Sequence, residues 1–517
     1  MGKLEIGSVD VLSRSNRTDL ILTGLTAAVI AIALTFGGAT RQGSLGDFTG
    51  QLIGLALLSL LIWTGRAAPH RLKLGRIGWT VFLSLPAICL IQLIPGLPGA
   101  SLESVDPAIT AEQPRAAWTY SSTSTAVAAS SLFVPLAIFV AVASLGFRSR
   151  LALIGVVAAL GAVSLVLGFV QVAQGPDSPL RLYSITNPSE AVGFFANRNH
   201  FAALLACLMV LAGTWFAQCI SRDSRAPKLR NIVSVEAVLS FTAVIAIMLG
   251  MALARSRAGI LLTFLVIVGV AIIALSTHKQ QRAAASRLPS LDGSLRIIVV
   301  GMACALLVAA QLGLQRLATR FTGDPLEDLR VALASTTIDG IVAAFPFGTG
   351  VGSFVPVYAT LENVDDLLSA YANRAHNDWL EFPLEGGVLA IVAMALFVVW
   401  YVARVYDRSA RNRQQSELRL QRSAALIILV LMVHSLVDYP LRTGALSAIF
   451  AMACGLLLVP PGTANERRDD PKSNPSGHEK RPAPPKTPRR AFVPAKPSRA
   501  TGSAAWPEAW QTPDESS

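Results

Sequence analysis

Residues 151–173 read LALIGVVAALGAVSLVLGFVQVA, a run of 23 residues without a charged side chain. A bilayer core about 30 Å thick is crossed by a helix of about 20 consecutive apolar residues, and this run is long enough. Similar runs recur along the chain, separated by connectors that carry the charges. This alternation is typical of a protein that crosses a membrane several times, and it decides the fold class.

The composition of the whole chain agrees with this interpretation. Of its 517 residues, 52% are hydrophobic and only 15% are charged, whereas soluble domains carry about 25% charged residues. A water-soluble globule of this composition would expose large apolar patches. The composition therefore argues against a soluble enzyme, a nucleic-acid-binding domain and a disordered protein. The net charge of +12 does not indicate nucleic acid, because most basic residues lie in short loops beside apolar runs.

We expect an all-α polytopic membrane protein with about twelve transmembrane helices. The predicted spans are 19–36, 49–64, 77–95, 127–146, 151–173, 199–220, 231–253, 258–276, 297–315, 384–403, 423–437 and 443–460. The loops after even-numbered spans hold 20 Lys and Arg against 4 Asp and Glu, and the loops after odd-numbered spans hold 11 against 16. Because basic loops stay in the cytoplasm, both termini are predicted to be cytoplasmic.

Three segments differ from the predicted transmembrane domain at 19–460. Residues 1–18 are predicted to form a cytoplasmic N-terminal segment. Residues 316–383, between spans 9 and 10, contain amphipathic stretches, and we expect a helical lid on the outer face. Residues 461–517 hold 11 of the 29 prolines and 10 basic residues against 7 acidic ones, which predicts a disordered cytoplasmic tail. The tail is either a solvated linker or is held near anionic lipid.

Polar clusters at membrane depth are candidates for function, because charge is costly there. The first is GFFANRNH at 193–200, which leads into span 6 and contains Arg198 and Asn199. A helix N-terminus favours anions and a guanidinium binds phosphate through two hydrogen bonds, so we expect a phosphate site. The structural alternative is a helix cap with an interfacial arginine.

The second cluster is ARSRA at 254–258, in the turn between spans 7 and 8. It places Arg255 and Arg257 on the outer face, against the usual distribution of basic residues. Two arginines in such a turn indicate an anion site. The alternative is a pair of arginines that extend to the membrane interface.

The third cluster is RAHNDWL at 374–380, followed by EGG at 385–387, where the long loop leads into span 10. His376 has the chemistry of a general base or of a group that positions a hydroxyl, with Asn377 or Asp378 orienting its ring. The alternative is a hydrogen-bonded surface histidine.

The fourth cluster is HSLVDYPLR at 434–442. His434 and Asp438 are four residues apart and share one helix face, so we expect them to brace the other site residues. A structural polar contact between helices is the alternative.

Other chemistry has little support in the sequence. The five cysteines lie in apolar runs without metal-ligand spacing, and we expect neither a metal nor a cofactor. The glycine-rich phrase PFGTGVG at 346–352 follows no predicted strand and lacks the lysine of a nucleotide-binding loop, so it is interpreted as a flexible turn in the lid.

In order and spacing, these motifs resemble the bacterial O-antigen ligase/polymerase superfamily over about residues 190–445. The matching features are the phrase at 193–200, the turn at 256–258, Arg330 upstream of 346–352, His376-Asn377 with Leu380 and the 385–387 phrase, and the 434–438 residues. Ala258 stands where the family more often has glycine, and Arg255 has no firm counterpart.

The resemblance implies a metal-independent membrane glycosyltransferase that needs no cofactor. Such enzymes transfer a glycan from undecaprenyl diphosphate to a hydroxyl of a glycan, a lipid A core or a protein, at the periplasmic face of the bacterial inner membrane. It implies three catalytic residues, which are His376, Arg257 and Arg198. From the resemblance together with the motifs themselves, we expect Arg255, Asn199, Arg330 and Asn377 to bind substrate, and Asp378, His434 and Asp438 to orient the other site residues.

The choice between a ligase and a polymerase stays open, because both share the donor chemistry. Two other functions remain as alternatives. A secondary transporter often has twelve spans with both ends inside, but we find no repeat of spans 1–6 in spans 7–12. A membrane scaffold acting through the proline-rich tail is the other.

Overall fold

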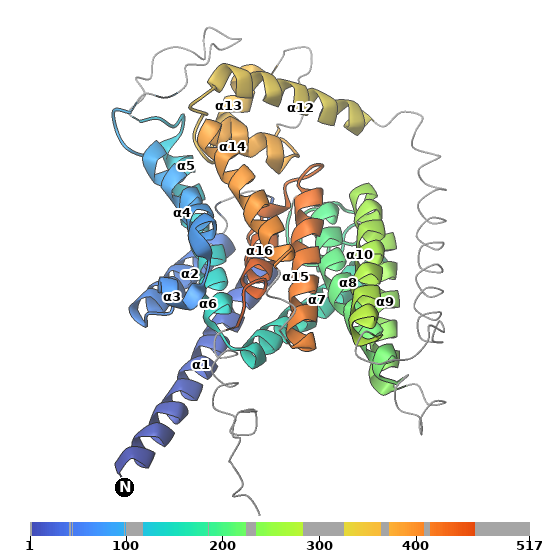
Figure 1. The fold of residues 1–517 in the computed structure, drawn as a ribbon. Coiled ribbons are helices and arrows are strands. Elements are labelled where there is room, and N and C mark those ends of the chain that lie inside the picture. The colour runs from blue at the N-terminus through green and yellow to red at the C-terminus, as the bar shows by residue number, and fades with distance from the viewer. Residues whose placement is uncertain are drawn as a thin grey trace, which may run out of the picture. The chain divides into compact units, whose positions relative to one another are not determined.

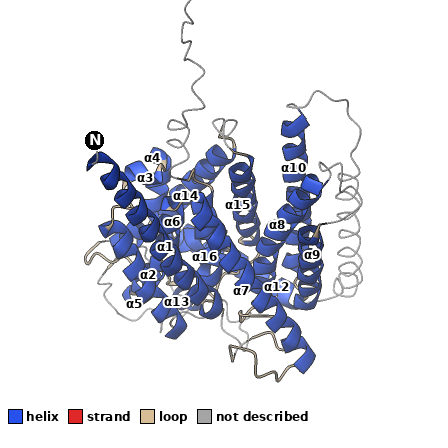
Figure 2. Cartoon of the chain, turned by 90° about the horizontal axis from the view of Figure 1, so that it is seen from below, coloured by secondary structure: helices blue, strands red, loops and turns tan. Residues whose placement is uncertain are grey.

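Figure 1 shows the computed structural model, which describes residues 3–40, 43, 45–97, 99, 117–184, 186–223, 234–282, 325–362, 372–407 and 414–460. In chain order the helices are α1 (Lys3–Phe36), α2 (Leu45–Trp63), α3 (Pro69–Leu72), α4 (Gly75–Gln92), α5 (Ser122–Ser131), α6 (Phe133–Ser144), α7 (Phe147–Gln174), α8 (Arg198–Asp223), α9 (Val235–Ala254), α10 (Arg257–Arg282), α12 (Pro325–Ala344), α13 (Phe354–Leu361), α14 (Asp378–Val405), α15 (Gln415–His434), the short η3 (Pro440–Arg442) and α16 (Gly444–Leu456). Figure 2 draws helices and loops, and no strand, over these residues. The predicted all-α class is confirmed for this part of the chain.

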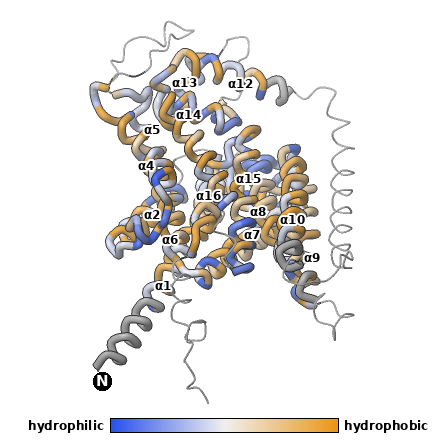
Figure 3. Tube along the Cα trace, viewed as in Figure 1, coloured by the Kyte–Doolittle hydropathy of each residue, from blue (hydrophilic) through white to orange (hydrophobic). Residues whose placement is uncertain are grey.

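Within the described ranges, nine helical segments are long and apolar enough to cross a membrane. They are Arg17–Phe36, Leu45–Trp63, Gly75–Gln92, Ser122–Ser144, Phe147–Gln174, Arg198–Ile220, Val235–Ala254, Arg257–Ser276 and Asp378–Val405. Hydrophobic residues run along most of these helices (Figure 3). The last two predicted spans fall on α15 and the 13-residue α16. The predicted span 297–315 lies outside the described residues, so the count of twelve stays a prediction.

The predicted N-terminal segment and the predicted tail differ in how much of them the structure describes. Helix α1 begins at Lys3, so most of the predicted N-terminal segment belongs to the same helix as the first span. By its internal contacts the chain divides into Met1–Thr463 and Ala464–Ser517. The second unit, and with it the predicted tail, lies outside the described residues.

Helix α8 packs against α7, α9, α10 and α15, and it is the most deeply buried of the candidate spans. A second group of contacts joins α1, α2, α6 and α16. Small residues allow this close packing: Ala137 and Ala141 of α6 are fully buried, and a side chain at Gly455 of α16 would press on Val142. Helix α8 is therefore enclosed by four neighbouring helices.

The segment predicted as a lid contains α12 and α13, which pack against α14 (Figure 1). Helix α14 is kinked at Gly387, which has φ +57° and ψ −144°. The glycine-rich turn 346–352 packs into this kink. Thr349 N donates to Leu384 O, Gly350 N donates to Glu385 O, and Val388 N donates to Pro346 O, at 2.8–3.0 Å. A Cβ at Gly387 would collide with the carbonyl oxygen of Pro346.

The interpretation of 346–352 as a flexible turn is therefore corrected. The turn supplies hydrogen-bond donors to carbonyl groups that the kink leaves without helical partners. The buried side chain of Gln92 on α4 completes the junction, donating to Glu385 O and accepting from Val351 N, both at 2.9 Å. The helical content of this region agrees with the expectation, while its role as a periplasmic lid stays a prediction.

Candidate active site

Asp438 lies at the centre of the largest convergence of predicted residues. It follows the C-terminal end of α15 and its side chain is fully buried. Its Oδ2 accepts a hydrogen bond from Nδ2 of Asn199 at 2.7 Å. Its Oδ1 accepts from Tyr439 N at 3.0 Å and lies 3.4 Å from Nδ1 of His376 and 3.6 Å from Nε2 of His200. The structure thus brings three of the four predicted clusters together at one carboxylate.

Asn199 also connects this carboxylate to the second cluster, at 254–258. Its Oδ1 accepts a hydrogen bond from Ser256 Oγ at 2.8 Å. Ser256 is the residue before α10, and its Oγ in turn accepts from Gly259 N at 3.0 Å. The hydrogen bond therefore joins the N-terminal ends of α8 and α10. It brings the backbone of Arg198 and Arg257, the first residues of these two helices, into one neighbourhood.

His376 lies at the accessible side of the site. Its side chain is 26% exposed, while its Nδ1 is buried and faces Asp438. Its ring lies edge-on to Tyr439, with 4.9 Å between the ring centroids. The backbone has φ +51°, an unusual conformation for a non-glycine residue. Such strained positions gather at functional sites.

His200 is a residue to which the sequence assigned no role. It is fully buried, its ring lies edge-on to Tyr439 at 4.8 Å, and its two ring nitrogens make no hydrogen bond to any described residue. An ionisable side chain inside a predicted span is a functional candidate by default, and this signal was present in the sequence. Asp438 thus has one buried and one partly exposed imidazole against the same oxygen.

The surroundings of Asp438 favour its charged form. Burial acts to raise its pKa, but the close approach of His200 and His376 outweighs burial and holds the pKa of Asp438 well below its usual range. The carboxylate therefore stays ionised at neutral pH. An ionised carboxylate at Nδ1 stabilises an imidazole that takes up a proton at its other nitrogen.

Arg198 is engaged by the loop before α8. Its Nη1 forms an ion pair with Glu190 Oε1 at 2.7 Å, and its side chain remains 21% exposed. A second guanidinium, which the sequence did not single out, lies in the same loop: Arg181 Nη1 donates to the carbonyl oxygens of Asn187 and Glu190. Its Nε and Nη2 are buried and make no hydrogen bond to any described residue. Two guanidiniums, those of Arg181 and Arg198, thus contact Glu190, one through a carbonyl oxygen and one through the carboxylate.

The other predicted arginines lie at the surface. Arg255 is exposed at the C-terminal end of α9 with φ +50°, and Arg257 is partly exposed. Arg330 is exposed on α12, near enough for its charge to act on His434. None of the described hydrogen bonds or ion pairs of Asp438 involves these three arginines.

Asn377 and Asp378 lie elsewhere than expected. Asn377 caps α14: its Oδ1 accepts from Trp379 N and Leu380 N, and its Nδ2 donates to Leu436 O. Oδ2 of Asp378 accepts from Ser435 Oγ at 2.9 Å and Leu441 N at 3.2 Å. The carboxylate that faces His376 is therefore Asp438, which corrects the expectation that Asp378 orients the ring.

His434 is buried beside the site, with its ring 6.4 Å from that of His200. The four-residue spacing of His434 and Asp438 allows a backbone hydrogen bond, in which Asp438 N donates to His434 O at 3.0 Å. The side chain of Asp438 is turned toward the two other histidines instead.

A second set of charges lies around the start of α14 and the η3 turn. We call it the ion cluster, and it comprises Arg374, Asp378, Glu381, Glu385 and Arg442. Arg442 pairs with Glu385 at 2.8 Å, and its Nε lies 3.6 Å from both Asp378 and Glu381. Arg374 pairs with Glu381 at 2.9 Å. Three carboxylates and two guanidiniums give the cluster a formal charge of −1.

The nearby carboxylates raise the pKa of Arg442 above its usual value, against the effect of its burial. Within the described residues, no group of three or more His, Cys, Asp or Glu side chains is arranged to hold a metal ion. The contacts of Asp438 provide an imidazole, that of His376, backed by a carboxylate.

Comparisons with known proteins bear on what this arrangement does. No curated protein matches the chain. Residues 241–395 match the family model described as O-antigen ligase. The match covers less than a third of the chain, and it contains Ser256, Arg257, Arg330 and His376, while His200 and Asp438 lie outside it. Over this segment the chain is similar to O-antigen ligase, and the match supports membership of that superfamily of glycan ligases and polymerases.

Proposed function

We propose that the protein transfers a glycan from undecaprenyl diphosphate to an acceptor hydroxyl at the periplasmic face of the bacterial inner membrane. The acceptor is a glycan, a lipid A core or a protein. The observation that carries the proposal is the convergence on Asp438 of His376 and of the Asn199–Ser256 hydrogen bond. Ser256 and His376 lie inside the O-antigen ligase match.

In this reaction the acceptor oxygen attacks the anomeric carbon of the donor. A new C–O bond forms, and the bond between that carbon and the diphosphate oxygen breaks. The hydroxyl proton passes to the exposed face of His376, away from Nδ1. Asp438, buried and ionised behind Nδ1, stabilises the imidazolium that results.

The departing diphosphate takes the electron pair and gains negative charge. The first residues of α8 and α10, Arg198 and Arg257, are suited to stabilise it, because helix N-termini and guanidiniums both favour anions. Arg181 has two buried guanidinium nitrogens without a hydrogen bond to described residues, and it adds to this charge. A sugar diphosphate is already activated, so the step needs neither nucleotide nor metal.

The proposal is tested with purified protein in nanodiscs. Undecaprenyl-diphosphate-linked glycan is supplied in EDTA without nucleotide, with an envelope extract as acceptor source, and released undecaprenyl diphosphate is measured. We expect acceptor-dependent release that is lost in His376→Ala and in Arg257→Ala. The size of the product separates polymerisation from ligation.

Two matched variants serve as controls. His70→Ala removes an exposed histidine on α3, and Arg148→Ala removes an exposed arginine in the first turn of α7. Both should keep full release. Full release by His376→Ala and Arg257→Ala would refute the mechanism. Absence of release in folded, donor-binding wild-type protein would favour the transporter alternative.

A further inference from the structure

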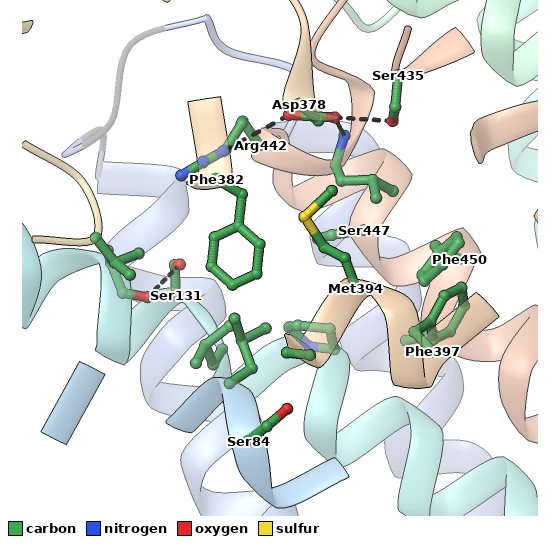
Figure 4. Close-up of a pocket in the computed structure, with 18 of the residues that line it drawn as sticks. Ser84, Ser131, Asp378, Phe382, Met394, Phe397, Ser435, Arg442, Ser447 and Phe450 are labelled. Carbon is green, nitrogen blue, oxygen red and sulfur yellow. Dashed lines mark hydrogen bonds and ion pairs between the residues drawn. The ribbon is translucent and has the colours of Figure 1, made fainter. Parts of the chain in front are cut away.

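A cavity of about 340 Å³ lies between α4, α5, α6, α14, α15 and α16 (Figure 4). Most of its lining is apolar. Its lining includes Ser84 of α4, Asp378, Ala393 and Phe397 of α14, Arg442 of η3 and Phe450 of α16. Its volume is in the range of sites that bind small molecules.

The position of the cavity indicates how a ligand reaches it. Helices α4, α5–α6 and α14 are among the candidate spans. Of the 18 most apolar consecutive residues, only 22% are buried in α4 and 17% in α14. The rest of these helices presents apolar side chains such as Leu83, Leu90 and Val399 outward. In a bilayer these faces meet lipid, so a ligand that fills the cavity comes from hydrocarbon and is itself apolar.

The two ends of the cavity differ. Figure 4 shows Asp378, Arg442 and Ser435 at one end, and Phe397, Phe450 and Ser84 toward the other. A ligand that matches both ends has an apolar chain and a polar head.

The charge at the polar end decides which head fits. The guanidinium of Arg442 is already compensated by the carboxylates of the ion cluster, whose formal charge is −1. A phosphate there would compete with three carboxylates for Arg442. In contrast, Oδ1 of Asp378 is buried and accepts no hydrogen bond from any described residue. Its ion-pair partner, Arg442 Nε, lies 3.6 Å away, so a donor such as a hydroxyl would satisfy this oxygen.

We propose that this cavity binds the hydrocarbon chain of a lipid whose head is neutral and carries hydroxyl groups. In the reaction proposed above, on which this part of the inference rests, that lipid is the acceptor and not the diphosphate donor. The donor head belongs instead beside Arg198 and Arg257, where the charge is positive.

The polar end of the cavity adjoins the segments that carry the site. Asp378 is two residues from His376, and its backbone N donates to Ser435 O at 2.9 Å. Ser435 lies three residues before Asp438 on the same turn. A head group held at Asp378 therefore lies beside the two segments that contribute His376 and Asp438.

Binding is tested without catalysis, by photolabelling. The probe is hexadecyl β-glucoside with a diazirine in mid-chain, added to the full chain in nanodiscs, and the adducts are mapped by mass spectrometry. We expect adducts on α4, α14 and α16. Unlabelled hexadecyl β-glucoside should compete at a concentration about tenfold lower than hexadecyl phosphate does. Equal or better competition by the phosphate would overturn the proposal.

Cavity-filling variants provide the structural control. Ala393→Phe fills the cavity from α14, whereas Val392→Phe enlarges its neighbour, which is 50% exposed and does not line the cavity. Labelling should fall about tenfold in Ala393→Phe and persist in Val392→Phe. If Ala393→Phe does not fold, Ser84→Phe fills the cavity from α4. Undiminished labelling in a folded filling variant would overturn the proposal.

An activity measurement then separates this inference from the proposed function. The filling variant should raise KM for a lipid-borne acceptor about tenfold, and leave kcat and KM for a water-soluble acceptor glycan unchanged. Equal effects on both acceptors would contradict the role as acceptor site. If the protein transfers no glycan at all, the labelling result still decides whether the cavity binds a neutral lipid.

Discussion

Two groups of buried charges each include a residue of the 435–442 segment, Asp438 in one and Arg442 in the other, and they differ in the kind of partner. Around Asp438 a single carboxylate faces an amide and two imidazoles, groups that are neutral or exchange a proton. In the ion cluster three carboxylates face two guanidiniums, whose charge is permanent. The two groups therefore serve different purposes although they are neighbours.

The difference lies in what each group can exchange. The Asp438 group contains His376, which is partly exposed and can pass a proton to and from a substrate. The ion cluster holds its charges by mutual attraction and ties the start of α14 to the η3 turn. We interpret the Asp438 group as the site of proton transfer and the ion cluster mainly as a structural contact between α14 and the η3 turn.

The largest effect is expected from Asp438→Asn. The amide removes the charge behind His376, so kcat for glycan transfer should fall about 10²- to 10⁴-fold, with little change in donor KM. The control is Asp339→Asn, which alters an exposed carboxylate on α12. Near-normal kcat in Asp438→Asn would place this carboxylate with the structural charges.

Arg442→Met should act on stability instead. It leaves buried carboxylates without a counter-ion, and the free energy of unfolding should fall by about 3–5 kcal/mol. Thermal unfolding in detergent measures the loss. The double variant Arg442→Met/Glu385→Gln should recover part of it, because it removes one of the unpaired charges. A normal Tm with a large loss of kcat in folded protein would reverse the assignment of the ion cluster.

The contribution of Asp438 to stability should depend on pH. Because the pKa of Asp438 is depressed in the fold, its ionised form contributes stability above the unfolded pKa of about 3.9, and this is lost as pH falls through the lower folded pKa. The Tm difference between wild type and Asp438→Asn should thus persist from about pH 8 to pH 5 and shrink only below about pH 4. A difference that vanished between about pH 7 and pH 5 would contradict the depressed pKa.

The smallest effect is expected from Ser256→Ala. It removes the hydrogen bond to Asn199 but none of the charges, so a loss of about 0.5–1.5 kcal/mol is expected, or up to about tenfold in kcat. Ser256→Thr keeps the hydroxyl and should restore activity. A loss as large as that of Asp438→Asn would show that the α10 end contributes far more than positioning.

The helices were predictable because apolar length is a local property of the sequence. The predicted run 151–173 lies within α7, and Asn377 caps α14 directly after the histidine. Kinks were harder to predict, because Gly387 breaks α14 only through contacts with the distant turn at 346–352.

The site was predictable as a set of motifs but not as a set of pairs. The motifs single out Asn199, His376 and Asp438, yet they predict Asn377 or Asp378 as the partner that orients His376. The left-handed backbone at His376 and the fold of the η3 turn bring Asp438 there instead. His200 received no role, because its significance depends on a carboxylate 238 positions further along the chain.

The junction at Gly387 also determines how this region moves. Since the turn at 346–352, the first turns of α14 and Gln92 of α4 share hydrogen bonds across three segments, they form one stiff joint. Rotation of α12 and α13 about this turn would therefore break these hydrogen bonds. A displacement of α13 would therefore also displace α14 and α4. It would reach the start of α14, two residues after His376.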